Sequence, residues 1–240
     1  MSRITLAEMN DRLDNQQKGN YINQFYLRND KDHTIVQMLL DDVANIEVHS
    51  VHEVRMTSKG GKDYRIMVDC LGDNCPMCKE ALKHEGQKFP LVRKARDMIY
   101  IPLIRLYNDN GEYEPVYEVF SRSTRWYRDE LAGYAARYNI NGYVEVEKTG
   151  TGMKTTYKLY EARKDFDGNP LDNPKSIAEL KEDFEIKDDD ICGRRDSLIK
   201  TWTADEFAEF LETGTYPKGN TESTNEEDVK PRSRSSNRGF

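Results

Sequence analysis

Three of the four cysteines in this chain of 240 residues are clustered in the pattern Cys70-x4-Cys75-x2-Cys78. A tight turn can direct two thiolates that are separated by two residues at one metal ion, and the end of a preceding strand can supply the third. Structural zinc takes four ligands, so one more is needed. The sequence therefore predicts one structural zinc ion (Zn2+) per chain. The histidines that could complete the site are His49, His52 and His84.

The same cluster raises two enzymatic interpretations. Residues 75–78 have the Cys-Pro-x-Cys form of a glutaredoxin-like redox centre, but that chemistry needs a βαβ setting near the start of the fold. A zinc-dependent nucleobase deaminase needs His-x-Glu and Pro-Cys-x-x-Cys, whereas here His52 and Glu53 are adjacent and Pro76 lies inside the motif. A thiol-disulfide oxidoreductase stays as the alternative enzyme, and a zinc-stabilised protein-interaction adaptor as the alternative without catalysis. The chain also lacks a P-loop and a His-Glu-x-x-His motif, so we expect no catalytic residues.

Tyrosine and basic residues are interleaved through the middle of the chain, and 13 of the 14 tyrosines precede residue 161. Proteins that bind single-stranded nucleic acid without sequence preference combine stacking rings with a cationic groove. No more than half of the rings should contact nucleic acid, because the others must fill the core. The candidate DNA-binding residues are Arg55, Lys62, Tyr64, Arg65, Arg93, Lys94, Tyr100, Arg105, Tyr107, Arg122, Arg125 and Trp126.

The net charge of −7 argues at first against a nucleic-acid ligand, but the charge is unevenly distributed. Residues 51–128 contain 14 Lys and Arg against 11 Asp and Glu, whereas residues 165–212 contain 6 against 15. A protein that binds phosphate needs a local positive groove and not a positive total. The charge therefore neither establishes nor excludes DNA binding.

The hydrophobic pattern favours short strands joined by hairpins. Alternating or apolar segments predict strands over 21–27, 34–40, 46–56, 64–69, 98–107, 115–120, 143–147 and 155–160. Helical spacing predicts helices over 5–16, 76–83 and 123–138. One helix inserted before the last pair of strands is typical of an OB-fold. We expect a mainly β protein, a small Greek-key barrel with a zinc-binding insertion and one inserted helix.

Composition divides the chain into four parts. We expect an N-terminal helical arm over 1–19, an OB-fold DNA-binding core with the zinc site over 20–164, and an acidic extension over 165–212 with weak helices at 176–183 and 204–211. Residues 213–240 are nearly free of apolar side chains and should form a disordered tail. The first 15 residues have no apolar stretch of the kind a secretory signal needs, so we expect a cytoplasmic protein.

Residues 21–163, about 60% of the chain, resemble the zinc-containing single-stranded DNA-binding proteins of tailed bacteriophages, also called helix-destabilising proteins. The shared pattern is a strand that contains His52-Glu53-Val54, a hairpin, and a strand that ends at Cys70. The sequence Asp-Asn-Cys-Pro-Met-Cys-Lys at 73–79 and an apolar strand at 98–107 follow. The resemblance implies an OB-fold with zinc clipped into the DNA-binding face, and it selects His52 as the fourth ligand.

The resemblance also implies a function and partners. It predicts sequence-nonspecific, non-catalytic binding of single-stranded DNA in DNA replication, recombination or repair, within the host cytoplasm if the protein is viral. Replication or recombination proteins would bind through the C-terminal region, and self-association along DNA is expected in part of the family. This chain departs from the family pattern at its first residues, where residues 2–5 carry a single positive charge. It departs again in the tail, where basic residues follow the acidic residues 226–228.

Overall fold

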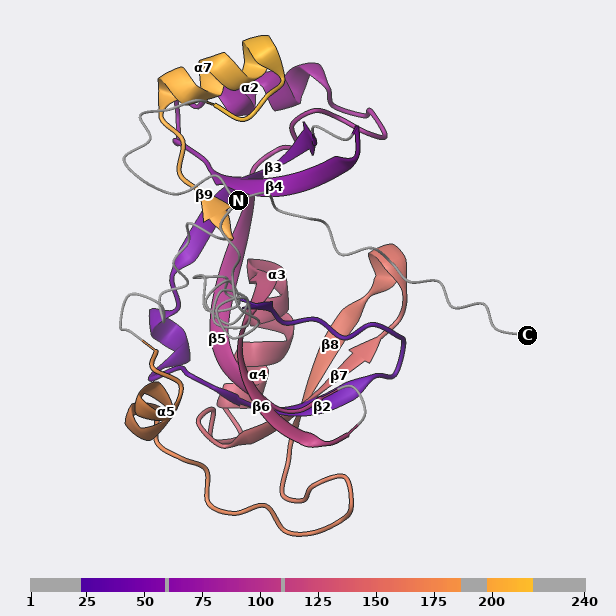
Figure 1. Cartoon of the computed structure of the whole chain (residues 1–240), viewed down its shortest axis with the longest axis vertical. Helices are drawn as coiled ribbons and strands as arrows, with labels where there is room; N and C mark the ends of the chain where they lie inside the picture. The colour runs from indigo at the N-terminus through magenta and orange to yellow at the C-terminus, as the bar shows by residue number, and fades with distance from the viewer. Residues whose placement is uncertain (1–22, 59–60, 109–110, 187–197, 218–240) are drawn as a thin grey trace, which may run out of the picture.

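The computed structural model describes residues 23–58, 61–108, 111–186 and 198–217, and these form two lobes on one long strand (Figure 1). The strands are β1 (Asn23–Gln24), β2 (His33–Met38), β3 (Val48–Thr57), β4 (Asp63–Asp69), β5 (Arg96–Tyr107), β6 (Tyr113–Ser123), β7 (Tyr143–Thr149), β8 (Thr156–Glu161) and β9 (Ile199–Lys200). The helical elements are η1 (Val43–Asn45), α2 (Pro76–Lys83), α3 (Thr124–Trp126), η2 (Tyr127–Leu131), α4 (Ala132–Ala135), η3 (Gly152–Lys154), α5 (Ile177–Asp183) and α7 (Ala204–Thr213).

The metal lobe consists of β3, β4, α2, β9 and α7, and the sheet lobe consists of β1, β2, β6, β7, β8, α5 and the helical segment from α3 to α4. Strand β5 runs through both (Figure 1). It has 12 residues and so extends about 40 Å, roughly twice the length of an ordinary strand. Burial of nearly every residue from Met98 to Leu106 agrees with the two-sided apolar pattern of this segment.

The strand pairings show that the sheet does not close as the expected barrel. One edge of β5 pairs with β6, and the other pairs first with β3 and then with β2. The order β8-β7-β2-β5-β3-β4-β9 therefore has two separate ends, and the described strands form no pairing that joins them. The pairs β1–β6 and β4–β9 are parallel and the other pairs are antiparallel. The prediction of a β-rich, mostly antiparallel sheet is confirmed, but the closed barrel is wrong.

The expected helix after β6 forms as one helical segment with a π turn in its middle. It begins after Ser123, whose side chain accepts a hydrogen bond from the backbone N–H of Trp126. The five residues of η2 are the π turn, and the segment ends at Ala135. Its buried residues Trp126, Leu131 and Tyr134 pack into the core of the sheet lobe.

Both helices of the expected acidic extension pack onto the lobes. Leu180 of α5 is buried against the sheet lobe beside Ile35 and Ile104. Phe207 and Phe210 of α7 are fully buried in the core of the metal lobe. A segment that is acidic overall therefore contributes apolar anchors to both halves of the molecule.

The expected helix over 5–16, the N-terminal arm and residues 218–240 of the expected tail lie outside the described residues. None of the described helices is long and apolar enough to cross a membrane.

Candidate metal centre and the adjoining cleft

Four potential metal ligands from three elements converge in the metal lobe. His52 comes from β3, Cys70 follows the end of β4, and Cys75 and Cys78 flank the start of α2. Their ligand atoms all lie within 4.8 Å of one another. The Nε2 atom of His52 lies 3.5 Å from the Sγ atoms of both Cys75 and Cys78, and the Sγ atoms of Cys70 and Cys78 are 3.5 Å apart.

These separations fit a tetrahedral metal ion. Bonds of about 2.3 Å to sulfur and about 2.0 Å to nitrogen give S–S edges of about 3.8 Å and S–N edges of about 3.5 Å. The three edges given above match these values within a few tenths of an ångström. A set of three cysteines and one histidine is also a common structural zinc set. The cluster could therefore hold one metal ion such as zinc.

The ring of His52 is oriented for this role. Its Nδ1 lies 2.9 Å from the backbone carbonyl oxygen of Arg93 and donates a hydrogen bond to it, which leaves the lone pair of Nε2 directed at the cysteines. The side chain is fully buried, and burial lowers the pKa of the imidazole below its usual value. His52 is therefore neutral at pH 7, as a metal ligand must be.

The thiol pKa values show why the cluster suits a cation. Burial and the neighbouring sulfurs of Cys70 and Cys75 raise the pKa of Cys78 to about 12. Burial also acts to raise the pKa of Cys75, but hydrogen bonds from backbone N–H groups, including those of Met77 and Cys78, outweigh it and lower the pKa. Three thiolates at this distance repel one another, so a bound divalent cation would stabilise the ionised set.

The other two candidate histidines lie elsewhere. His84 Nε2 is 2.9 Å from Glu80 Oε1 on the same helix, and His49 packs edge-on against the ring of Tyr100. The spacing of residues in the sequence left three histidines as candidates for the fourth ligand, and the structure brings only His52 of these to the cysteines. This agrees with the choice that the family resemblance implied.

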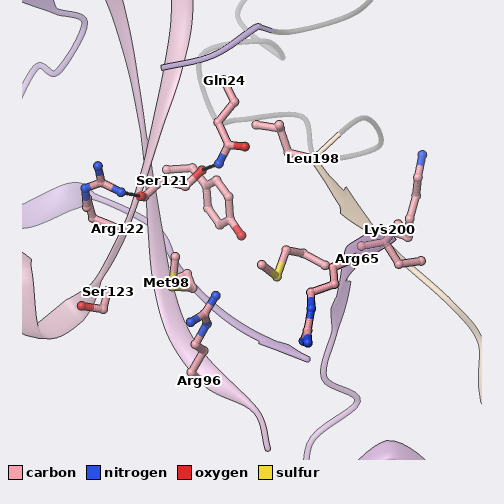
Figure 2. A pocket seen from close by; sticks show the side chains of 12 residues that line it. Gln24, Arg65, Arg96, Met98, Ser121, Arg122, Ser123, Leu198 and Lys200 are labelled. Carbon is pink, nitrogen blue, oxygen red and sulfur yellow. Dashed lines mark hydrogen bonds between the residues drawn. The ribbon is translucent and has the colours of Figure 1, made fainter. Parts of the chain in front are cut away.

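A cleft of about 510 Å³ lies beside the metal lobe, where β4 and β9 face β5 and β6 (Figure 2). Arg65 and Lys200 extend from one side, and Arg96 and Met98 from the other. None of the described residues that line the cleft is acidic. The lining therefore combines cationic groups with apolar surface, which suits an anionic ligand that has flat hydrophobic parts.

A buried carboxylate behind the cleft organises its arginines. Glu53 is only 8% exposed and forms ion pairs with Arg65, with Arg93 Nε at 3.5 Å and with Arg96 Nη2 at 3.4 Å. Three guanidinium groups share one carboxylate, so the cluster keeps an excess positive charge. Because His52 and Glu53 are consecutive in β3, their side chains point to opposite faces, one to the cysteines and one to the arginines.

The structure gathers only part of the expected DNA-binding set at this cleft. Arg65 and Tyr100 line it, and Arg93 joins the same ion-pair cluster. Lys62 and Lys94 are exposed but do not line the cleft. Tyr64 is partly exposed and does not line the cleft. Because side chains alternate along β4, Tyr64 lies on the same face as Ile66 and on the face opposite to Arg65.

Several other side chains that were expected to contact DNA already have partners within the protein. Trp126 is 7% exposed, its Nε1 donates a hydrogen bond to the carbonyl oxygen of Tyr157, and its ring packs in the core of the sheet lobe. Arg122 borders the cleft, but its guanidinium lies on the other face of β6, over the rings of Phe120 and Tyr157 at 4.0 and 3.8 Å (Figure 2). The remaining pairings are Arg55 with Asp63, Arg105 with Glu118, Arg125 with Asp129, and Tyr107 with Tyr113 and Phe166.

Sequence reasoning missed some of the cleft residues. Arg96 and Met98 share the face of β5 that carries Tyr100, so strand alternation could have identified them. Lys200 gave no such signal, because it reaches the cleft through the pairing of Val68 with Lys200 across more than 130 residues.

Comparison of the chain with protein-family models and with curated protein sequences finds no match.

Proposed function

We propose that this protein binds single-stranded DNA without sequence preference and without catalysis, and that it acts in DNA replication, recombination or repair. The observation that carries the proposal is the cleft between the lobes, which Arg65, Arg96 and Lys200 line together with apolar and neutral polar side chains, and which has no acidic lining residue among those described. Nonspecific single-strand binding requires cations for the phosphates and apolar surface for the bases. The resemblance to the zinc-containing phage proteins supports the same function.

We also propose that the metal is zinc and that its role is structural. Four protein ligands fill a tetrahedral ion completely, so no position is left for the water or substrate that a catalytic zinc would bind. The ion would fix β3 and β4 against α2, and these strands supply Glu53 and Arg65 beside the cleft. Metal binding would therefore hold one wall of the cleft in place. We propose in addition that the open sheet of this protein is related to the OB-fold, because OB-folds include barrels that are only partly closed.

Titration of fluorescent oligo-dT with the purified protein at several salt concentrations tests the function. If the cleft binds phosphates, log affinity should fall linearly with log salt, with a slope of about −0.7 for each phosphate contacted. Two to four such contacts are expected from the cations at the cleft. No binding at low salt, or binding that does not respond to salt, would contradict the proposal.

A further inference from the structure

Tyr100 has a buried hydroxyl group without a hydrogen-bond partner among the described residues. The residue is only 7% exposed, yet it lines the floor of the cleft between the lobes. A buried polar group left unpaired destabilises the folded state, so folded proteins seldom retain one without a reason. Because this hydroxyl lies at a cationic cleft, a bound ligand could supply the missing hydrogen-bond partner.

The ring of Tyr100 is not available for stacking on a base. It belongs to an apolar cluster with Val51, Val119 and Ile199, which joins the two lobes. The ring of His49 also packs edge-on against it, with centroids 5.5 Å apart. The hydroxyl is therefore the part of the side chain that can reach a ligand.

The groups around the hydroxyl indicate what kind of atom it meets. Arg65 and Arg96 line the same cleft, and the positive charge of Arg96 and the negative charge of Asp69 both act on the Tyr100 phenol. The cross-strand neighbour Ser121 already accepts a hydrogen bond from Gln24 Nε2 at 3.2 Å. Burial and the charge of Asp69 raise the pKa of Tyr100 to about 12, against the opposing effect of Arg96, so the phenol keeps its proton at neutral pH and can donate. A donor in a cleft that two guanidinium groups line suits an anionic oxygen.

On the basis of the proposed function, we infer that the Tyr100 hydroxyl donates a hydrogen bond to a phosphodiester oxygen of the bound strand, whose charge Arg65 and Arg96 balance. A base edge fits less well, because it presents donors as well as acceptors and carries no charge. Tyr100 then fixes the position of one phosphate at the floor of the cleft, and the bases lie along the more open surface.

The Tyr100→Phe variant tests this inference, because it removes only the hydroxyl and retains the ring. Affinity for oligo-dT should fall about tenfold, since hydrogen bonds to charged groups are among the stronger ones. The slope of log affinity against log salt should stay the same, because the number of cations is unchanged. The melting temperature of the free protein should not fall, because the lost hydroxyl has no partner. The matched control is Tyr113→Phe, which removes a hydroxyl from a 67% exposed ring at the far end of the β5–β6 ladder and should not alter affinity.

An abasic oligonucleotide of equal length, measured at low salt, distinguishes phosphate from base. If the hydroxyl meets a phosphate, Tyr100→Phe should weaken binding of the abasic strand by the same factor as oligo-dT. A penalty that disappears on the abasic strand, or a wild-type protein that does not bind that strand at all, would overturn the assignment. Equal affinity of Tyr100→Phe and wild type for oligo-dT would overturn the inference and leave the proposed function intact. Failure of the wild type to bind oligo-dT would instead contradict the proposed function.

Discussion

The sheet lobe buries 15 side chains of the described residues in one core, with Phe25, Phe120, Trp126, Tyr134 and Tyr157 among them. The core of the metal lobe contains ten, and these include Cys75 and three aromatic residues from the chain segment around α7. A core of that size seldom supports a fold without a metal ion or disulfide bond. The two lobes therefore differ in what stabilises them. We expect hydrophobic burial to suffice for the sheet lobe, and the metal lobe to depend on a bound ion and on the docking of α7.

Removal of the metal should produce the largest difference between the lobes. Structural zinc contributes on the order of 10–16 kcal/mol of apparent binding energy to the fold that it holds. A strong chelator should therefore expose the amides of β3, β4 and α2 to hydrogen exchange and leave those of β6, β7 and β8 protected. Uniform loss of protection across both lobes would show that the metal stabilises the whole chain, and no change would show that it is dispensable.

The matched variants His52→Ala and His84→Ala sharpen the same test. Metal analysis should find stoichiometric zinc in the reduced wild-type protein and in His84→Ala, because His84 pairs with Glu80 outside the cluster, and should find none in His52→Ala. Retention of stoichiometric zinc by His52→Ala would remove this histidine from the ligand set. Absence of zinc from freshly purified wild type would contradict the metal site and favour a thiol role for the Cys-Pro-x-Cys motif.

Truncation of one buried phenylalanine in each lobe should separate their stabilities. Phe207 and Phe120 are both fully buried, so replacement of either by alanine should cost about 3–5 kcal/mol. Phe207→Ala should also speed the transfer of zinc to a chelator, since α7 packs beside Met77 of the helix that carries Cys78. Phe120→Ala should lower the melting temperature without that effect. Equal zinc-transfer rates in the two variants would show that α7 does not support the metal site.

Much of the metal site was readable from the sequence because its determinants are local. The alternation of Tyr64, Ile66 and Val68, the spacing of the cysteines and the proline that opens α2 all act within a few residues. The order of the strands in the sheet depends instead on pairing between residues that are far apart in the sequence. No local pattern shows that one edge of β5 pairs with two different strands, so the expected barrel was wrong.

The cleft residues were harder to predict because aromatic and basic residues alternate in the same stretches of sequence, and some of them lie in the core while others lie at the surface. Trp126 and Arg65 each lie in stretches where aromatic and basic residues alternate, yet Trp126 is in the core and Arg65 is at the cleft. Which side of the sheet each residue faces follows from strand register and from the helix that covers it. These features are fixed by tertiary structure and not by composition.

Neutralising one cation at the cleft should have a smaller effect than losing the metal. Arg96→Gln should weaken binding of oligo-dT several-fold and reduce the magnitude of the salt slope by about 0.7, because one phosphate contact is lost. Arg125→Gln is the matched control, since Arg125 is exposed and pairs with Asp129 away from this cleft. A larger loss in Arg125→Gln than in Arg96→Gln would move the binding surface to the sheet lobe.

Removal of residues 218–240 should have the smallest effect. The acidic residues 226–228 can compete with phosphate for the cations of the cleft, so the truncated protein should bind oligo-dT equally or slightly more tightly, with an unchanged melting temperature. Truncation after residue 213 should in addition lower the melting temperature slightly, because it removes Tyr216, whose ring packs edge-on against Trp202. Much weaker DNA binding after the shorter truncation would assign the tail a direct part in binding.

Competition between oligo-dT and duplex DNA of equal length, at one moderate salt concentration, decides whether the protein prefers single-stranded DNA. A cleft that holds one strand by its phosphates and its apolar surface should bind oligo-dT much more tightly, because the bases of a duplex are stacked inside it and cannot reach the protein. We expect a preference of at least tenfold for the single strand. Equal or tighter binding of the duplex would contradict it, whatever metal the protein contains.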